Sequence, residues 1–189
     1  MTELSRLRAE AKGGRDPTCA DETLALLKRY TAGKEQYLEI GAAEGLTVCA
    51  LLLENPALHA VAIERDPVRA SRAREHFSAF GVSDRVQLYE GDAGAILPMV
   101  ECVFNVIFLD GPKAQYIKYL PDCKRLLRRG GALFSDDILL YGWVRGEPPK
   151  KRRMLVEHIR EYLTLLENDP DFDTQIFEYG EGLAVSTKR

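Results

Sequence analysis

The chain has 189 residues, 46% hydrophobic and 29% charged, with a formal net charge of -3. This composition excludes a disordered or collagen-like chain. The length predicts one domain, with a short extension at residues 1–20 before a main unit at residues 21–189. The small negative charge argues against a general nucleic-acid binder but allows a local basic patch. The longest apolar stretch, residues 48–53, is far shorter than the roughly 20 residues that cross a bilayer, so no membrane span is expected.

The N-terminus and the cysteines indicate the cellular compartment. Residues 1–14 lack the apolar core of a secretory signal. The four cysteines form neither a C-x-x-C pair nor a Cys/His pattern with zinc spacing. We therefore expect reduced thiols in a cytoplasmic protein.

Short apolar runs alternate with helix-period segments from about residue 35 to residue 136. This alternation predicts an α/β fold with a doubly wound, Rossmann-like sheet, mostly parallel, in which a C-terminal hairpin supplies one antiparallel strand. Strands are predicted at residues 36–40, 59–64, 85–89, 104–109 and 132–135, followed by the hairpin strands 173–179 and 183–187. Helices are predicted at residues 21–30, 46–53, 67–80, 93–100, 115–128 (ending at Gly130 and Gly131) and 150–167.

The turn after the first strand, which contains Gly41, Ala43 and Gly45, indicates a ligand site. Glycines between a strand and a helix let the backbone approach a ligand and direct helix N–H groups at it. The dinucleotide fingerprint G-x-G-x-x-G is not met, because Ala43 and Leu46 take its second and third glycine positions. This favours a nucleoside ligand without phosphates. Glu39, beside the turn, would repel phosphate but tolerate a ligand that carries ammonium and sulfonium charge.

The next two strands also end in acidic residues. Glu64 closes the second strand, where a carboxylate can bind both ribose hydroxyls. Asp92 and Ala93 follow the third strand, where an adenine edge could be read. Open α/β sheets bind ligands outside the carboxyl ends of their strands. Acidic positions at three successive strand ends therefore favour a binding site over solvated strand-end acids.

Two further strands end in carboxylates, Asp110 after the fourth strand and Asp136 with Asp137 after the fifth. Both ends point to the same edge of a parallel sheet, so these side chains can converge. Three oxygen ligands without Cys or His suit a hard cation such as Mg²⁺. Lys113, three residues after Asp110, could reach the same place. The structural alternative is that Asp136 and Asp137 only cap a loop.

The first three strand ends resemble the S-adenosylmethionine site of class I methyltransferases, and the terminal hairpin resembles the antiparallel last strand of that fold. The similarity covers nearly the whole chain from residue 21 onward. It implies a methyltransferase core at residues 21–189 and S-adenosylmethionine as cofactor. The residues that it assigns to the cofactor are Glu39, Gly41, Ala43, Gly45, Thr47, Glu64, Asp92, Ala93 and Asp110.

The carboxylate pattern resembles the metal-dependent O-methyltransferase family of catechol and caffeoyl-CoA O-methyltransferases. In that family an Asp is followed three residues later by Lys, and then by an Asp-Asn pair. Asp110, Lys113 and Asp136 match, whereas Asp137 stands where Asn is usual. The resemblance implies catalytic roles for Asp110 and Lys113 and a divalent cation at Asp110, Asp136 and Asp137.

A hydroxyl beside a second oxygen suits this chemistry. A divalent cation chelated by both oxygens would favour the deprotonated hydroxyl. Lys113 could accept the proton as a general base. The oxygen would then attack the sulfonium methyl in line, and much of the acceleration would come from positioning the two partners.

Segments near the C-terminus favour one branch of the family. Residues 148–156, 168–172 and 180–186 are similar to bacterial tRNA 5-hydroxyuridine methyltransferases, which form 5-methoxyuridine at the wobble position. That base carries vicinal 4-oxo and 5-hydroxy oxygens, as a catechol does. Four cations at a predicted helix start could hold RNA phosphates. Cations at a helix start are unfavourable in the helix dipole, which favours a purpose other than stability; the alternative is a solvated basic face. They are Lys150, Lys151, Arg152 and Arg153.

Several alternatives remain open from the sequence. The chain could methylate catechol-like small molecules, bind S-adenosylmethionine without catalysis or, more remotely, use a nicotinamide cofactor. Tyr141 and Trp143, in the loop at residues 139–149, could stack on a base or only pack that loop. Family members usually carry more helical sequence before the cofactor core than residues 1–20 provide here, and those helices often build the acceptor site and a homodimer. The resemblance therefore implies a homodimer, with fewer N-terminal residues to build it and the acceptor site.

Overall fold

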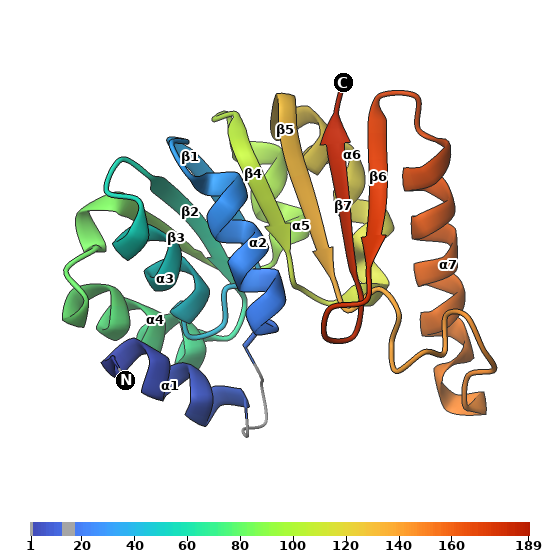
Figure 1. Cartoon of the computed structure of the whole chain (residues 1–189), viewed down its shortest axis with the longest axis horizontal. Coiled ribbons are helices and arrows are strands. Elements are labelled where there is room, and N and C mark those ends of the chain that lie inside the picture. Colours follow the sequence, from blue (N-terminus) through green and yellow to red (C-terminus); the bar gives the residue numbers. More distant parts are fainter. Residues whose placement is uncertain (1, 13–17) are drawn as a thin grey trace.

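One seven-stranded sheet forms the centre of the computed structural model, which describes residues 2–12 and 18–189 (Figure 1). Its strand order is β3-β2-β1-β4-β5-β7-β6. β7 is antiparallel to both of its neighbours, and every other pair is parallel. The predicted doubly wound fold and its antiparallel hairpin strand are therefore confirmed. The strands are β1 (Gln36–Ile40), β2 (His59–Glu64), β3 (Val86–Glu90), β4 (Phe104–Leu109), β5 (Leu127–Asp136), β6 (Phe172–Phe177) and β7 (Leu183–Lys188).

Helices cover both faces of the sheet because its central strands are apolar on both sides. On one face, Leu38 and Ile107 pack with α5, α6 and α7. On the other, Tyr37 and Phe108 pack with α2, α3 and α4. No helix within the described ranges is long and apolar enough to cross a membrane. The helices are α1 (Glu3–Lys12), α2 (Asp21–Thr31), α3 (Leu46–Glu54), α4 (Pro67–Ala79), α5 (Ala93–Ile96), α6 (Tyr116–Leu126) and α7 (Arg153–Asn168), with short 3-10 helices at Ser83–Arg85, Leu97–Met99, Lys113–Gln115 and Lys150–Arg152.

The boundary between α6 and β5 differs from the prediction of a helix at 115–128 that ends at Gly130 and Gly131. The helix ends one residue before Leu127, which is buried and already pairs with β4. The β4–β5 register then shifts, which marks a bulge. Gly130 has φ +74, and a Cβ at Gly131 would lie 2.8 Å from the Asn105 carbonyl oxygen. The two glycines therefore serve a strand bulge, not a helix end.

The carboxyl ends of the five parallel strands lie along one edge of the sheet, where β1 and β4 make close backbone contact. The Asp110 N–H donates a hydrogen bond to the Ile40 carbonyl at 2.9 Å. Gly41 has φ +90, and a Cβ there would collide with the Asp110 carbonyl. Only glycine lets the turn after β1 lie against the residue that follows β4.

Replacing Gly41 with alanine should therefore destabilise the protein. The added Cβ would meet backbone atoms that cannot move aside independently of the sheet. We expect the free energy of unfolding in urea to fall by about 2 kcal/mol or more. Gly33→Ala is the matched control, because Gly33 also has positive φ (+66) but no atom within 4 Å of the added Cβ. That variant should lose only about 1 kcal/mol, and equal losses would show that the contact with Asp110 is unimportant.

Candidate functional site

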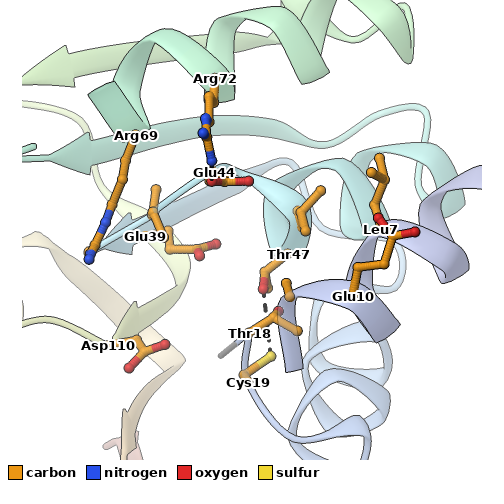
Figure 2. A pocket seen from close by; sticks show the side chains of 15 residues that line it. Leu7, Glu10, Thr18, Cys19, Glu39, Glu44, Thr47, Arg69, Arg72 and Asp110 are labelled. Atoms are coloured by element: carbon orange, nitrogen blue, oxygen red, sulfur yellow. Dashed lines mark hydrogen bonds and ion pairs between the residues drawn. The ribbon is translucent and has the colours of Figure 1, made fainter. Parts of the chain in front are cut away.

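Two cavities, of about 320 and 290 Å³, open at this edge of the sheet. The first lies between the β1 turn and helix α1 (Figure 2). The second lies over the ends of β2 and β3. Because they have wall residues in common, the two cavities form one cleft. The shared residues are Gly41, Ala43, Arg69 and Asp110.

The turn between β1 and α3 holds three residues in the left-handed region. They are Gly41, Ala43 (φ +47) and Gly45 (φ +74). A Cβ at Gly45 would collide with the ring of Phe77 on α4. Ala43 accepts a strained φ at a cost of about 1 kcal/mol, and its N–H donates to Glu64 at 2.8 Å. Contacts with the sheet and with α4 thus fix the backbone conformation of this turn.

Carboxylates oriented by backbone N–H groups line the second cavity. Glu64 accepts hydrogen bonds from the N–H groups of Ala43 and Asp66, both at 2.8 Å. Asp92 caps α5 by accepting from the Gly94 N–H at 2.9 Å. Ala93 lines the same cavity. Each carboxylate oxygen can accept a further hydrogen bond, so the arrangement can receive hydroxyl or amino donors of a ligand.

Glu39 lines the first cavity and is only 2% exposed. Its carboxylate accepts a hydrogen bond from the Tyr37 hydroxyl at 2.6 Å. Burial raises the pKa of Glu39 to about 8, and the nearby charge of Asp110 adds to the shift in spite of the Tyr37 hydrogen bond. A cationic ligand in this cavity would favour the ionised form. Thr47, also predicted as a donor-site residue, lines the same cavity.

The structure brings Asp110, Asp137 and Lys113 together. The Lys113 ammonium lies 3.0 Å from Asp110 and 2.9 Å from Asp137. Asp136 is 3% exposed and accepts the Asp137 N–H at 3.1 Å. Burial, together with the charges of Asp110 and Asp137, raises the pKa of Asp136 to about 8, and burial also raises the pKa of Asp110. This corner of the cleft therefore favours positive charge.

Lys113 carries that positive charge in the structure. Burial alone would lower its pKa, but Tyr116, Asp110 and Asp137 together outweigh burial and raise the pKa well above its usual value. In this arrangement the amine is held protonated, which is the opposite of what a general base requires. A role as proton acceptor therefore depends on a change in the charge around the two carboxylates.

The buried side chain of Tyr116 contacts Lys113 and the ends of β4 and β5. Its hydroxyl donates to the Leu109 carbonyl at 2.8 Å and lies 3.2 Å from the Asp136 carbonyl. The Lys113 ammonium lies over its ring, 5.8 Å from the centroid. The end of β4, the end of β5 and the lysine between them are thus tied to one buried side chain.

The three residues predicted to hold a divalent cation lie at the ends of β4 and β5. Asp110, Asp136 and Asp137 offer only oxygen donors, which in kind suit a hard cation. In the part of the chain that the structure describes, however, no three Asp, Glu, His or Cys side chains are arranged to hold a metal ion. The Lys113 ammonium takes the place between Asp110 and Asp137.

The four predicted RNA-binding cations lie outside both cavities. All four are exposed at the start of α7, and none has an ion-pair partner within the described residues. In the preceding loop, Tyr141 is 69% exposed, whereas Trp143 is half-buried and packs against the core. Of the two loop aromatics, Tyr141 is the one whose side chain is exposed to a ligand. The four cations that follow this loop are Lys150, Lys151, Arg152 and Arg153.

Helix α1 is absent from the predicted elements, yet it forms a wall of the first cavity. Leu7, Glu10 and Ala11 line the cavity from this helix (Figure 2). The helical spacing of Leu4, Leu7 and Ala11 is the sequence signal that indicates an amphipathic helix there. Part of the segment expected only as an extension thus contributes directly to the cleft.

Two arginines of α4 also escape prediction from the sequence. Arg69 and Arg72 extend from this helix to the rim of the first cavity (Figure 2). Arg72 pairs with Glu44 at 2.6 Å. The sequence predicts only that these two arginines are exposed on a helix, because their spacing does not distinguish them from the other arginines of that helix.

Comparison with known proteins identifies the family. A family model described as O-methyltransferase matches residues 1–189. The chain belongs to this O-methyltransferase family. It is an S-adenosylmethionine-dependent enzyme, as the resemblance of its first three strand ends implied.

The O-methyltransferase has relatives of several names. It is 31% identical over 147 residues to a catechol O-methyltransferase of Mycobacterium tuberculosis, a match that covers 77% of this chain and 63% of that protein. It is 27% identical to a caffeoyl-CoA O-methyltransferase of Populus kitakamiensis, covering 85% of this chain and 72% of the relative. A Staphylococcus aureus structure, provisionally named a caffeoyl-CoA O-methyltransferase, has a TM-score of 0.92 at 26% identity and covers 100% of this chain and 93% of its own. The similarity therefore extends over the whole chain.

The raised pKa of Glu39 predicts a pH-dependent stability for the ligand-free O-methyltransferase. A folded-state pKa of about 8, against 4.5 for the unfolded group, means that the folded state binds the proton more tightly between these values. Stability should therefore fall as the pH rises from about 4.5 to about 8.

Glu39→Gln should remove this contribution. We expect the variant to be more stable than the parent by roughly 1–3 kcal/mol at pH 8.5 and to show little difference at pH 4.5, measured by urea unfolding. Glu35→Gln, at an exposed glutamate, is the control and should behave alike at both pH values. A Glu39→Gln variant that is less stable at pH 8.5 would contradict the assignment.

Proposed function

We propose that this enzyme transfers the methyl group of S-adenosylmethionine to 5-hydroxyuridine at the wobble position of tRNA, which gives 5-methoxyuridine. In this proposal residues 1–189 act as one catalytic unit in the cytoplasm. The single observation that carries the choice of acceptor is the exposed basic cluster at residues 150–153. It has no ion-pair partner in the described chain, and it lies at the start of α7, at the end of the sheet where the parallel strands terminate (Figure 1).

The chemistry of the cleft supports the placement of the donor. Glu64 and Asp92 in the second cavity present acceptors to ribose hydroxyls and to an adenine amino group. Glu39 and Asp110 in the first cavity present negative charge to an ammonium and a sulfonium. In Figure 2 the Glu39 carboxylate lies between Asp110 and Thr47. A donor that spans both cavities would place its sulfonium near Asp110, which they share.

We propose that a divalent cation displaces the Lys113 ammonium from Asp110 and Asp137 and is held by these two residues and Asp136, with Mg²⁺ favoured by their oxygen donors. When bound there, the cation supplies positive charge that favours the ionised acceptor hydroxyl and lowers the pKa of Lys113. Lys113 then accepts the hydroxyl proton at Nζ. The anchoring of Lys113 by Tyr116 keeps this amine at the acceptor side of the cleft.

The basic cluster and its surroundings favour a phosphate-bearing acceptor. Two other cations have carboxylate partners, Arg72 with Glu44 and Arg160 with Glu157. The four at residues 150–153 have none within the described chain, so their charge is available to phosphates. The exposed ring of Tyr141 offers a face on which a base could stack.

A catechol-like small molecule is the second candidate acceptor. It is favoured by the catechol O-methyltransferase of M. tuberculosis, which is 31% identical to this chain over 147 residues. A catechol offers the same pair of vicinal oxygens, so the cation and Lys113 would act alike on either substrate.

Methylation assays separate the two acceptors. Purified enzyme with S-adenosylmethionine and Mg²⁺ is expected to form 5-methoxyuridine in tRNA that carries 5-hydroxyuridine, detected by nucleoside mass spectrometry. Asp136→Ala should abolish product while keeping donor affinity within about threefold, because Asp136 lines neither cavity. Glu64→Ala should weaken donor binding by about tenfold or more, as the loss of a buried hydrogen-bonding carboxylate predicts. Product on catechols alone would contradict the tRNA assignment.

Neutralising Lys150, Lys151, Arg152 and Arg153 to glutamine should raise the KM for tRNA. We expect an increase of about tenfold or more at 0.1 M salt, because each lost phosphate contact lowers affinity. The KM for free 5-hydroxyuridine should change less than about twofold, since a nucleoside has no phosphates to lose.

A double variant, Lys151→Gln with Arg152→Gln, should also raise the KM for tRNA, although by less than the quadruple variant. Its charge-matched control is the double variant Arg128→Gln with Arg129→Gln. Both control arginines are exposed but lie at the start of β5, at the opposite edge of the sheet. They should leave both KM values unchanged. Equal effects on tRNA and nucleoside in the cluster variant would assign the cluster to folding.

A further inference from the structure

A buried arginine of α1 has no role in the chemistry described above. Arg8 is only 5% exposed although it carries a full charge. The carboxylate that it pairs with, Asp21, lies 3.7 Å away and is itself 71% exposed. Such a pair compensates little for the cost of taking a guanidinium out of water.

The polar contacts of Arg8 connect it to the wall of the first cavity. Its Nη1 donates to the Thr18 hydroxyl at 2.7 Å, and its Nη2 donates to the Cys19 carbonyl at 3.0 Å. The Thr47 hydroxyl lies 3.5 Å from Nη1. Thr18, Cys19 and Thr47 all line the first cavity. The guanidinium is therefore separated from the cavity by a single layer of side chains.

Arg8 also determines what the two hydroxyls can do. A threonine hydroxyl that accepts a hydrogen bond from a guanidinium has its own O–H hydrogen left to donate. Donation by a cation strengthens that hydrogen bond in turn. Thr18 and Thr47 can therefore present polarised O–H groups to the cavity, with a positive charge directly behind them.

The rest of the cavity has the opposite sign. Glu39 and Asp110 line it as well, and Arg8 is close enough to Glu39 to lower the pKa of that carboxyl against the larger effect of burial. One part of the cavity thus favours an anion and another part a cation. A zwitterionic α-amino acid group has this charge pattern.

We propose that Arg8, acting through Thr18 and Thr47, forms a subsite for the carboxylate of the methyl donor's amino-acid end. The donor's ammonium then lies toward Glu39 and Asp110. Arg8 is a positioning residue in this scheme, and α1 becomes part of the donor site. The inference rests on the proposed binding of S-adenosylmethionine in this cleft.

The simplest competing role for Arg8 is to fasten α1 to the rest of the molecule. A purely structural arginine would affect all ligands of the cleft alike. Decarboxylated S-adenosylmethionine separates the two roles, because it keeps the adenosine, the sulfonium and the ammonium and lacks only the carboxylate.

The test measures the Kd of both ligands by isothermal titration calorimetry with the full-length protein and its Arg8→Gln variant. We expect Arg8→Gln to weaken S-adenosylmethionine by about tenfold and the decarboxylated ligand by less than about twofold. Arg6→Gln is the control: Arg6 lies on the same helix, but its side chain is 49% exposed and pairs with Glu3 and Glu10. It should leave both affinities unchanged.

Arg8→Lys keeps the charge and decides the question if Arg8→Gln fails to fold. A lysine cannot reproduce the forked contacts to Thr18 and Cys19, so the preference for the carboxylated ligand should fall by about threefold. Equal weakening of both ligands, or no weakening of either, would overturn the subsite and leave the proposed function intact. Parent protein that binds no S-adenosylmethionine would overturn the proposed function as well.

Discussion

Burial of carboxylates at the carboxyl edge of the sheet is the constraint on which the rest of the site depends. Glu39, Glu64 and Asp136 are only 2%, 6% and 3% exposed. Buried carboxylates are costly unless hydrogen bonds or positive charge compensate for them. Backbone N–H groups compensate Glu64, and the Tyr37 hydroxyl does so in part for Glu39. The charge that is left over gives a cleft that attracts cations, which is the property that a sulfonium donor requires.

Backbone contacts between the strand ends fix the relative positions of these carboxylates. The turn after β1 can lie against the end of β4 because Gly41 has no side chain. The Tyr116 hydroxyl holds the end of β4 close to the end of β5. The acidic groups on three strands are therefore positioned by the sheet itself, and small displacements of one strand would affect all of them.

The sequence predicted the strands at the centre of the sheet well, because continuous apolar runs such as 104–109 are typical of strands covered on both faces. It was wrong about 115–132, where Gly130 and Gly131 suit a helix end and a bulge equally until Leu127 is seen to pair with β4. It did not predict α1, because this helix buries little apolar surface by itself. The helix is held by packing against α3 and by the contacts of Arg8.

The sequence by itself determined the order of the elements and the identity of the acidic residues at the strand ends, because both are local properties of short segments. Tertiary structure decided which of these residues meet, and with what charge. It placed the Lys113 ammonium between Asp110 and Asp137 and raised its pKa, contrary to the behaviour expected of a base. It also brought Arg8 to Thr47, 39 positions away in the chain. Such distances depend on how layers pack, and burial sets the strength of a charge only once the surrounding layers are in place.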